Sequence, residues 1–101
     1  MSLLLSNLFA ALSRRRQARA HARRGNGLYQ RGDFEGAVAE YQEALRLAPD
    51  LPLTLFNLGL ALYKTGRKGE ARKSWEEALA LSEGRNDYLA EQTRIMLRQF
   101  G

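Results

Sequence analysis

Residues 18–51 and 52–85 are two imperfect copies of one 34-residue pattern. Shifting the sequence by 34 places aligns nine identical pairs, against roughly three expected by chance from a composition rich in Leu and Ala. The pairs are Gly25/Gly59, Leu28/Leu62, Tyr29/Tyr63, Gly32/Gly66, Ala37/Ala71, Glu43/Glu77, Ala44/Ala78, Leu45/Leu79 and Leu47/Leu81. A fixed period of this length indicates stacked copies of one supersecondary unit, so it restricts the fold more than any other feature.

The apolar spacing inside each copy is helical. In the second copy Leu55, Leu58 and Leu62 recur three and four residues apart, residues 65–67 interrupt the pattern, and it resumes from Ala71. This alternation predicts two antiparallel helices joined by a short turn.

Turn and capping residues divide the chain where such hairpins need to end. Asp33 is expected to cap a helix after the turn at Gly32, and the two prolines of residues 48–52 separate one unit from the next. Asn86 or Asp87 is expected to cap a last helix, which would close the end of the stack.

The residue pattern resembles the tetratricopeptide repeat. The matching residues of the second copy are Leu55, Leu58, Gly59, Leu62, Ala71, Trp75 and Ala78, and those of the first are Gly25, Leu28, Ala37, Tyr41, Ala44 and Pro49. The chain departs from the pattern at His21 and Arg24, which stand where the family has large apolar residues, and at Glu83, which replaces the closing proline.

We therefore expect an all-α fold, a tetratricopeptide-like α-solenoid of tandem antiparallel helix hairpins. Its parts are an N-terminal amphipathic and basic helix over residues 1–17, repeats over 18–51 and 52–85, and a C-terminal capping helix over 86–101. Within the repeats, Gly25 facing Ala44 and Gly59 facing Ala78 would let the helices approach closely, while aromatic side chains fill the space between units.

The resemblance implies a binding surface, because the first helix of each unit lines the concave groove in that family. Carried over by position, the partner-binding residues are Arg19, Arg23, Asn26, Tyr29, Leu53, Phe56, Asn57, Leu60, Tyr63 and Lys64. The carboxylate clamp of some family members is incomplete here, because Ala22 replaces its first Lys and Asp87 and Glu91 stand where cations are needed.

Four of these residues make the first helix of the second copy apolar nearly all round. Leu53, Phe56, Leu60 and Tyr63 lie opposite the leucine series, and burying them would contribute on the order of 6–10 kcal/mol. Something must cover this stripe: another helix of the chain, a second copy forming a homo-oligomer, or a partner helix or peptide.

The N-terminal segment is apolar on one side and then strongly basic. Its candidate anchor for a membrane or another anionic surface consists of Leu4, Leu5, Leu8, Phe9, Leu12, Arg14, Arg15 and Arg16. The ten residues 3–12 are too few to span a bilayer, and the order of charge is the reverse of a secretory signal. Three interpretations remain: a helix packed against the repeats, a membrane-surface helix, or an organellar presequence.

Charge and composition exclude several function classes. Residues 1–32 hold seven arginines and no acidic side chain, whereas the other 69 residues hold nine basic and eleven acidic ones. Nucleic-acid binding through the arginines is disfavoured because only Tyr29 offers a ring near them. With no Cys, a single His and no Gly-rich phosphate loop, we predict no enzyme, no cofactor and no metal site.

The sequence thus predicts a non-catalytic scaffold or adaptor that binds a protein or peptide partner, acidic or amphipathic, in the concave groove. The alternative is a membrane-peripheral protein anchored by residues 1–16. We expect a cytoplasmic location, at the membrane surface under that alternative.

Overall fold

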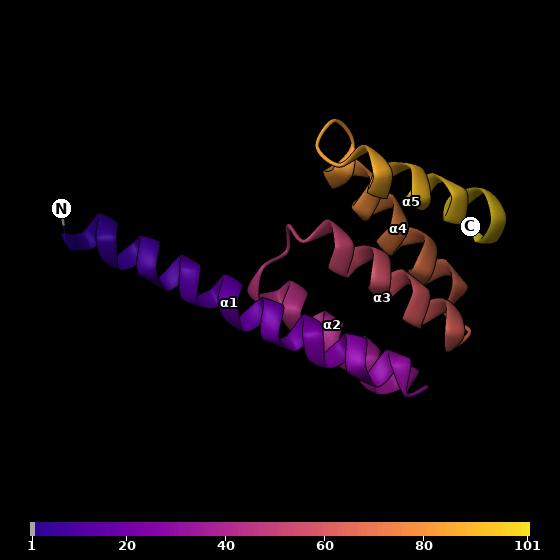
Figure 1. Ribbon diagram of the computed structural model, residues 1–101, viewed down its shortest axis with the longest axis horizontal. Helices are drawn as coiled ribbons and strands as arrows, with labels where there is room; N and C mark the ends of the chain where they lie inside the picture. Colours follow the sequence, from indigo (N-terminus) through magenta and orange to yellow (C-terminus); the bar gives the residue numbers. More distant parts are fainter. Residues whose placement is uncertain (1) are drawn as a thin grey trace.

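The computed structural model describes residues 2–101, all of whose regular structure is α-helical (Figure 1). The helices are α1 (Ser2–Gln30), α2 (Phe34–Leu47), α3 (Pro52–Lys64), α4 (Lys68–Ser82) and α5 (Asp87–Phe100). α1 pairs with α2, α3 pairs with α4, the hairpins stack through α2 and α3, and α5 packs on α4. The predicted all-α arrangement of two hairpins and an end helix is confirmed.

The helix boundaries follow from the capping and turn residues. Asp33 precedes α2, and its carboxylate accepts a hydrogen bond from the backbone amide of Gly36 at 2.9 Å. Asn86 does the same for α5 at 3.0 Å, so Asn86 is the cap there rather than Asp87. Gly32 and Gly66 have φ of 83° and 85°, which makes the turns inside the two hairpins equivalent. Pro52 opens α3, where a missing amide hydrogen costs nothing.

The core is centred on Tyr41 in α2 and Trp75 in α4, whose side chains are 2% and 0% exposed. Each ring packs against a glycine of the preceding helix, Tyr41 against Gly25 and Trp75 against Gly59. The closest side-chain neighbours of these glycines are therefore aromatic rings, and not the alanines that the sequence suggested. A side chain at either glycine position would overlap the ring, so only glycine allows the ring to pack this closely.

α1 differs from the expected pair of separate segments, because it is one helix running through the predicted boundary at residue 17. Its first half projects from the repeats (Figure 1), and the first tie to them is an ion pair of Arg15 with Asp50 at 2.7 Å. Ala18 follows, buried against Ala44 and Ala48. The interpretation that the N-terminal segment packs against the repeats is therefore wrong.

Helix geometry explains the projection. The side of α1 that meets α2 carries Ala18 and Gly25, and at 3.6 residues per turn the apolar side of residues 4–12 lies about a third of a turn away from it. α1 has 29 residues and α2 only 14, so residues 4–12 lie beyond the end of α2 and have no neighbouring helix to pack on. They stay exposed, as for Leu4 and Phe9, which are 74% and 67% accessible.

Candidate functional site

Two adjoining hollows lie on the inner face, the surface formed by α1, α3 and the start of α5. The first has a volume of about 300 Å³ and is lined by Arg19, Ala22, Arg23, Asn26, Leu51, Pro52, Leu53, Thr54, Asn57, Asn86 and Leu89. The second has a volume of about 250 Å³ and is lined by Asn26, Tyr29, Gln30, Tyr41, Asn57 and Leu60. Asn26 and Asn57 line both hollows, so they mark the boundary between them.

Seven of the ten residues predicted for the groove lie in these hollows. They are Arg19, Arg23, Asn26, Leu53 and Asn57 in the first and Tyr29 and Leu60 in the second, with the two asparagines shared. Leu53 is 59% exposed and is the most accessible apolar side chain of α3. The sequence missed Asn86, although the 34-residue period places it one repeat after Pro52 and so on the same side of the stack.

The other three predicted residues have structural contacts. The main-chain oxygen of Phe56 accepts a hydrogen bond from Trp75 Nε1 at 3.1 Å, and the Phe56 side chain packs on the core. Tyr63 stacks edge-on against Phe100 of α5, with ring centroids 5.1 Å apart. The ammonium group of Lys64 lies 5.8 Å from the centroid of an aromatic ring in α2. The chain itself therefore covers the C-terminal half of the α3 stripe, while Leu53 stays open.

A hydrogen-bonded group of three side chains fixes the centre of the inner face. Asn26 Oδ1 accepts from the Tyr41 hydroxyl at 2.6 Å and from Asn57 Nδ2 at 3.4 Å. Burial, with a smaller contribution from the charge of Tyr29, raises the pKa of Tyr41 to about 12, so Tyr41 donates at neutral pH. Within residues 2–101, Asn26 Nδ2 and Asn57 Oδ1 have no side-chain partner, which leaves an amide NH2 group and an amide oxygen available at the hollows.

The inner face is electropositive at its α1 side. Arg19 and Arg23 are exposed and, among residues 2–101, neither forms an ion pair. No acidic side chain lines either hollow. Glu91, which the clamp comparison placed near the groove, is instead held by Arg94 and Arg98 on α5. The hollows therefore attract negative charge through their arginines, because the described residues that line them include no carboxylate to compensate these.

His21 does not contribute to this face. Its Nδ1 lies 3.0 Å from a carboxylate oxygen of Glu40, so the side chain ties α1 to α2. The described part of the chain also contains no cluster of three His, Cys, Asp or Glu side chains arranged to hold a metal ion.

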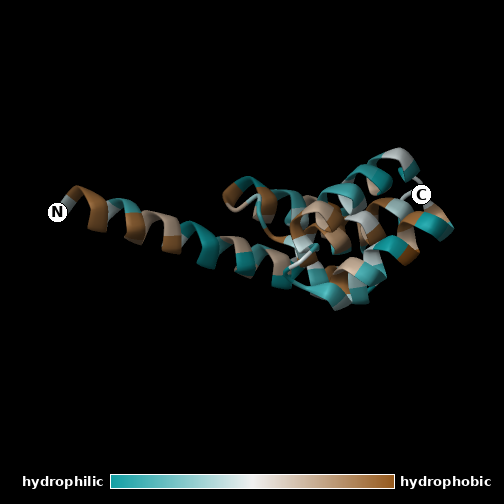
Figure 2. Ribbon diagram, turned by 90° about the horizontal axis from the view of Figure 1, so that it is seen from above, coloured by the Kyte–Doolittle hydropathy of each residue, from teal (hydrophilic) through white to brown (hydrophobic). Residues whose placement is uncertain are grey.

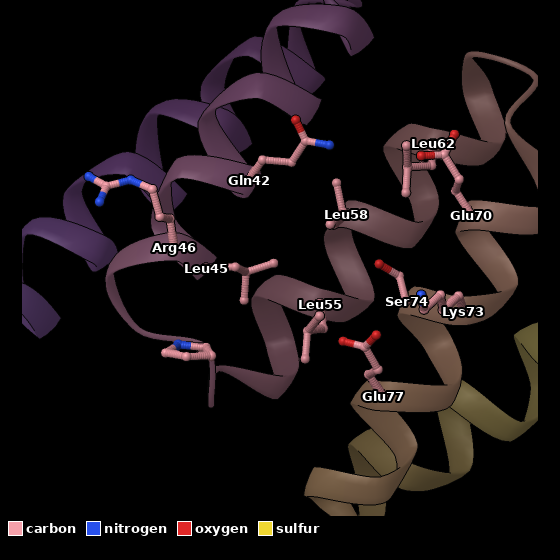
Figure 3. A pocket seen from close by; sticks show the side chains of 11 residues that line it. Gln42, Leu45, Arg46, Leu55, Leu58, Leu62, Glu70, Lys73, Ser74 and Glu77 are labelled. Atoms are coloured by element: carbon pink, nitrogen blue, oxygen red, sulfur yellow. The ribbon is translucent and has the colours of Figure 1, made fainter.

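A larger groove of about 490 Å³ runs along the opposite side, between α2 and α4 with α3 as its floor (Figure 3). Its lining consists of Gln42, Leu45, Arg46, Pro49, Leu55, Leu58, Leu62, Glu70, Lys73, Ser74 and Glu77. The floor leucines are buried in the core, and the rim mixes both signs of charge. Sequence reasoning missed this groove, since only Ser74, a small residue where α4 faces α3, hints at a gap there.

Comparison with known proteins agrees with the geometry. A family model described as a TPR repeat matches residues 25–66, and one described as a tetratricopeptide repeat matches residues 52–85. The TPR repeat-containing protein MJ1428 of Methanocaldococcus jannaschii is 41% identical over 54 residues, which are 54% of this chain and 9% of that protein. The chain thus matches less than a tenth of the length of this relative.

Together the two family matches span residues 25–85, which include both complete hairpin turns and the two aromatic residues of the core. Members of this family are typically non-catalytic. The chain therefore belongs to the tetratricopeptide repeat family, whose repeats serve as scaffolds for protein–protein interaction.

Proposed function

We propose that this protein is an adaptor whose inner face binds a short segment of an acidic or amphipathic partner protein. The observation that carries the proposal is the pair of adjoining hollows that share Asn26 and Asn57. In one place they offer an amide donor and an amide acceptor without a side-chain partner in residues 2–101, an exposed leucine, and two arginines that form no ion pair within the same residues.

Each of these groups suits one feature of a peptide. The donor of Asn26 and the acceptor of Asn57 are matched to the carbonyl and amide groups of a peptide backbone. Leu53 supplies apolar area for one side chain, and Arg19 and Arg23 form charge-assisted hydrogen bonds with carboxylates. Volumes of about 300 and 250 Å³ hold a few side chains and not a folded domain.

The experiment selects 12-residue peptides from a displayed library on the full-length protein and titrates the best binder by fluorescence anisotropy. We expect the selected peptides to be enriched in Asp and Glu, and Arg23→Glu to weaken their binding at least tenfold. Lys73→Glu, the same charge reversal on the opposite side of the molecule, is the matched control and should change the affinity little.

The apolar part is tested with Leu53→Ser against Tyr88→Ser. Both side chains are exposed, but Tyr88 lines neither hollow. Loss of affinity only in Leu53→Ser supports the proposal, and equal affinities of both variants would place the binding site elsewhere. Phe56 and Tyr63 are unsuitable probes, because their core contacts would mix folding with binding.

A further inference from the structure

We propose that one side of α1, residues 4–23, docks on the surface of a membrane that contains anionic lipids. The surface has two parts. The arm stripe is the apolar set Leu4, Leu5, Leu8, Phe9 and Leu12, and the arginine row is the cationic set Arg15, Arg16, Arg19 and Arg23.

The arm stripe is a contiguous apolar patch without cover. Each of its five side chains is more than half exposed, and the segment that carries it stands away from the repeats (Figure 1). Scattered single exposed leucines are ordinary, but five on adjacent turns mark an interaction surface.

The arm stripe and the arginine row lie on the same side of α1. With 3.6 residues per turn, all nine side chains fall within an arc of about 140° of the helix circumference. The structure shows the junction directly, because one surface hollow is lined by Leu12 together with the four arginines. Figure 2 shows that the outer part of the projecting segment is mostly hydrophobic and that hydrophilic residues become prominent further along α1, toward the repeats.

The charges favour lipid over a second copy of the chain. Two copies paired in parallel through their stripes would also bring their arginines together, and residues 1–32 contain no carboxylate to separate them. A nine-residue stripe is also only about 14 Å long, which is short for the roughly 1,200 Å² that a stable interface buries.

Anionic headgroups supply what the chain lacks. A helix lying in the interface buries its apolar side at the level where the acyl chains begin, and phosphate groups lie at the same depth as its cations. Arg15 is paired with Asp50, but Arg16, Arg19 and Arg23 have no ion-pair partner within residues 2–101. Among those residues, no helix has the length and apolarity needed to cross a bilayer, and the proposed contact is with its surface.

The apolar contact is tested by flotation of the full-length protein with vesicles of phosphatidylcholine containing about 30% phosphatidylglycerol, whose negative surface potential attracts basic segments. We expect binding, and at least a tenfold fall in the partition coefficient for Leu8→Asn. Leu3→Asn is the control, because Leu3 is exposed even more than Leu8, 73% against 52%, but lies outside the arc of the stripe. Its partition coefficient should stay within about twofold of the wild type, a shift comparable to that of an ordinary surface substitution.

The ionic contact is tested with Arg16→Gln against Arg14→Gln. The two variants lose the same charge from neighbouring exposed positions, but Arg14 points to the other side of α1. We expect Arg16→Gln to lower the partition coefficient about fivefold and Arg14→Gln to lower it less. Binding should also be weaker to vesicles of phosphatidylcholine alone and at higher salt.

Three results would overturn the proposal. They are no flotation with anionic vesicles, equal flotation of Leu8→Asn and Leu3→Asn, and sedimentation showing a dimer that Leu8→Asn abolishes. The last would assign the arm stripe to a second copy. Arg19 and Arg23 belong both to the arginine row and to the first hollow, so a docked α1 and a bound peptide would compete for them. The variants still distinguish the two proposals, because none of their substituted residues lines the hollows of the inner face.

Discussion

The two repeats share a pattern but differ in their first helices. α3 lies between α2 and α4 and is apolar on nearly every side. Tyr63, near the end of α3, is also covered by α5. α1 stands at the end of the stack, and its residues 14–24 include six arginines. Arg19 and Leu53 occupy equivalent positions one period apart. The position of a unit in the stack, and not the repeat pattern, therefore decides which of its surfaces are apolar.

What the repeats keep in common is the contact between a glycine and an aromatic ring. Gly25 meets Tyr41 in the first repeat, and Gly59 meets Trp75 in the second. The contact is enclosed by neighbours in the second repeat and bordered by the polar inner face in the first. Substitutions at these positions measure how much the enclosure matters.

The largest effect is expected for Gly59→Ala. The added methyl would overlap the indole of Trp75, which is fully buried and held by its hydrogen bond to α3. Overpacking should outweigh the gain in helix propensity and lower the free energy of unfolding by about 2 kcal/mol. Urea unfolding followed by the fluorescence of the single Trp measures this.

The matched control is Gly69→Ala in the first turn of α4, where a methyl would meet nothing within 4 Å. Its stability should equal or slightly exceed that of the wild type. If both variants unfold at the same urea concentration, the close approach of α3 to Trp75 is not a requirement of the fold.

A smaller effect is expected for Gly25→Ala. The added methyl would lie 2.7 Å from Tyr41 Cε1, and the ring must shift. Because this ring borders a hollow on the inner face, it has room to move, and the loss should be about 1 kcal/mol. A loss as large as that of Gly59→Ala would show that the first repeat is packed as rigidly as the second. Urea unfolding followed by circular dichroism provides the comparison.

The smallest expected effect is a pH dependence of the free energy of unfolding that comes from the first repeat alone, because Tyr41 can ionise and Trp75 cannot. The pKa of Tyr41 is raised to about 12, above its ordinary value near 10, so the unfolded chain loses this proton first as the pH rises. The stability that comes from keeping Tyr41 protonated in the folded protein is therefore fully present below about pH 10. It is lost as the pH rises from about 10 to about 12. From pH 9 to 11 the loss should be about 1 kcal/mol.

Tyr41→Phe should therefore have a flatter alkaline stability curve than the wild type, although it begins lower because the hydrogen bond to Asn26 is gone. Tyr88→Phe removes a hydroxyl from an exposed position and serves as the control. Parallel curves for Tyr41→Phe and the wild type would mean that the Tyr41 hydroxyl is solvated in the folded protein.

Much of the fold was predictable, because it depends on local signals. Helical spacing, the glycines of the two hairpin turns and the caps Asp33 and Asn86 each act within a few residues, and they place the helix ends where the structure has them. The 34-residue period then supplies the order of stacking.

The features that could not be predicted depend on which neighbours each side of a helix has in the folded protein. The apolar spacing of residues 4–12 predicts an amphipathic helix, but only the coordinates show that this part of α1 lies beyond the end of α2 and leaves its apolar side exposed. Likewise, α3 is apolar all round, so its sequence cannot tell Tyr63, covered by Phe100, from Leu53, which is open. The pairing of Asn26 with Tyr41 also needs coordinates, since the two residues come from different helices.

The unbroken course of α1 limits how the repeats can be oriented. Residues 2–24 contain neither Gly nor Pro, and the 29-residue helix is a single rod of about 44 Å. A flexible linker would let a tethered domain tumble, whereas a rigid helix that is held at its tip in one orientation also fixes the orientation of the repeats at its other end. Since the hollows and the arm stripe share one side of this rod, a surface that holds the tip also sets the direction in which the hollows open, and their search for a ligand becomes two-dimensional.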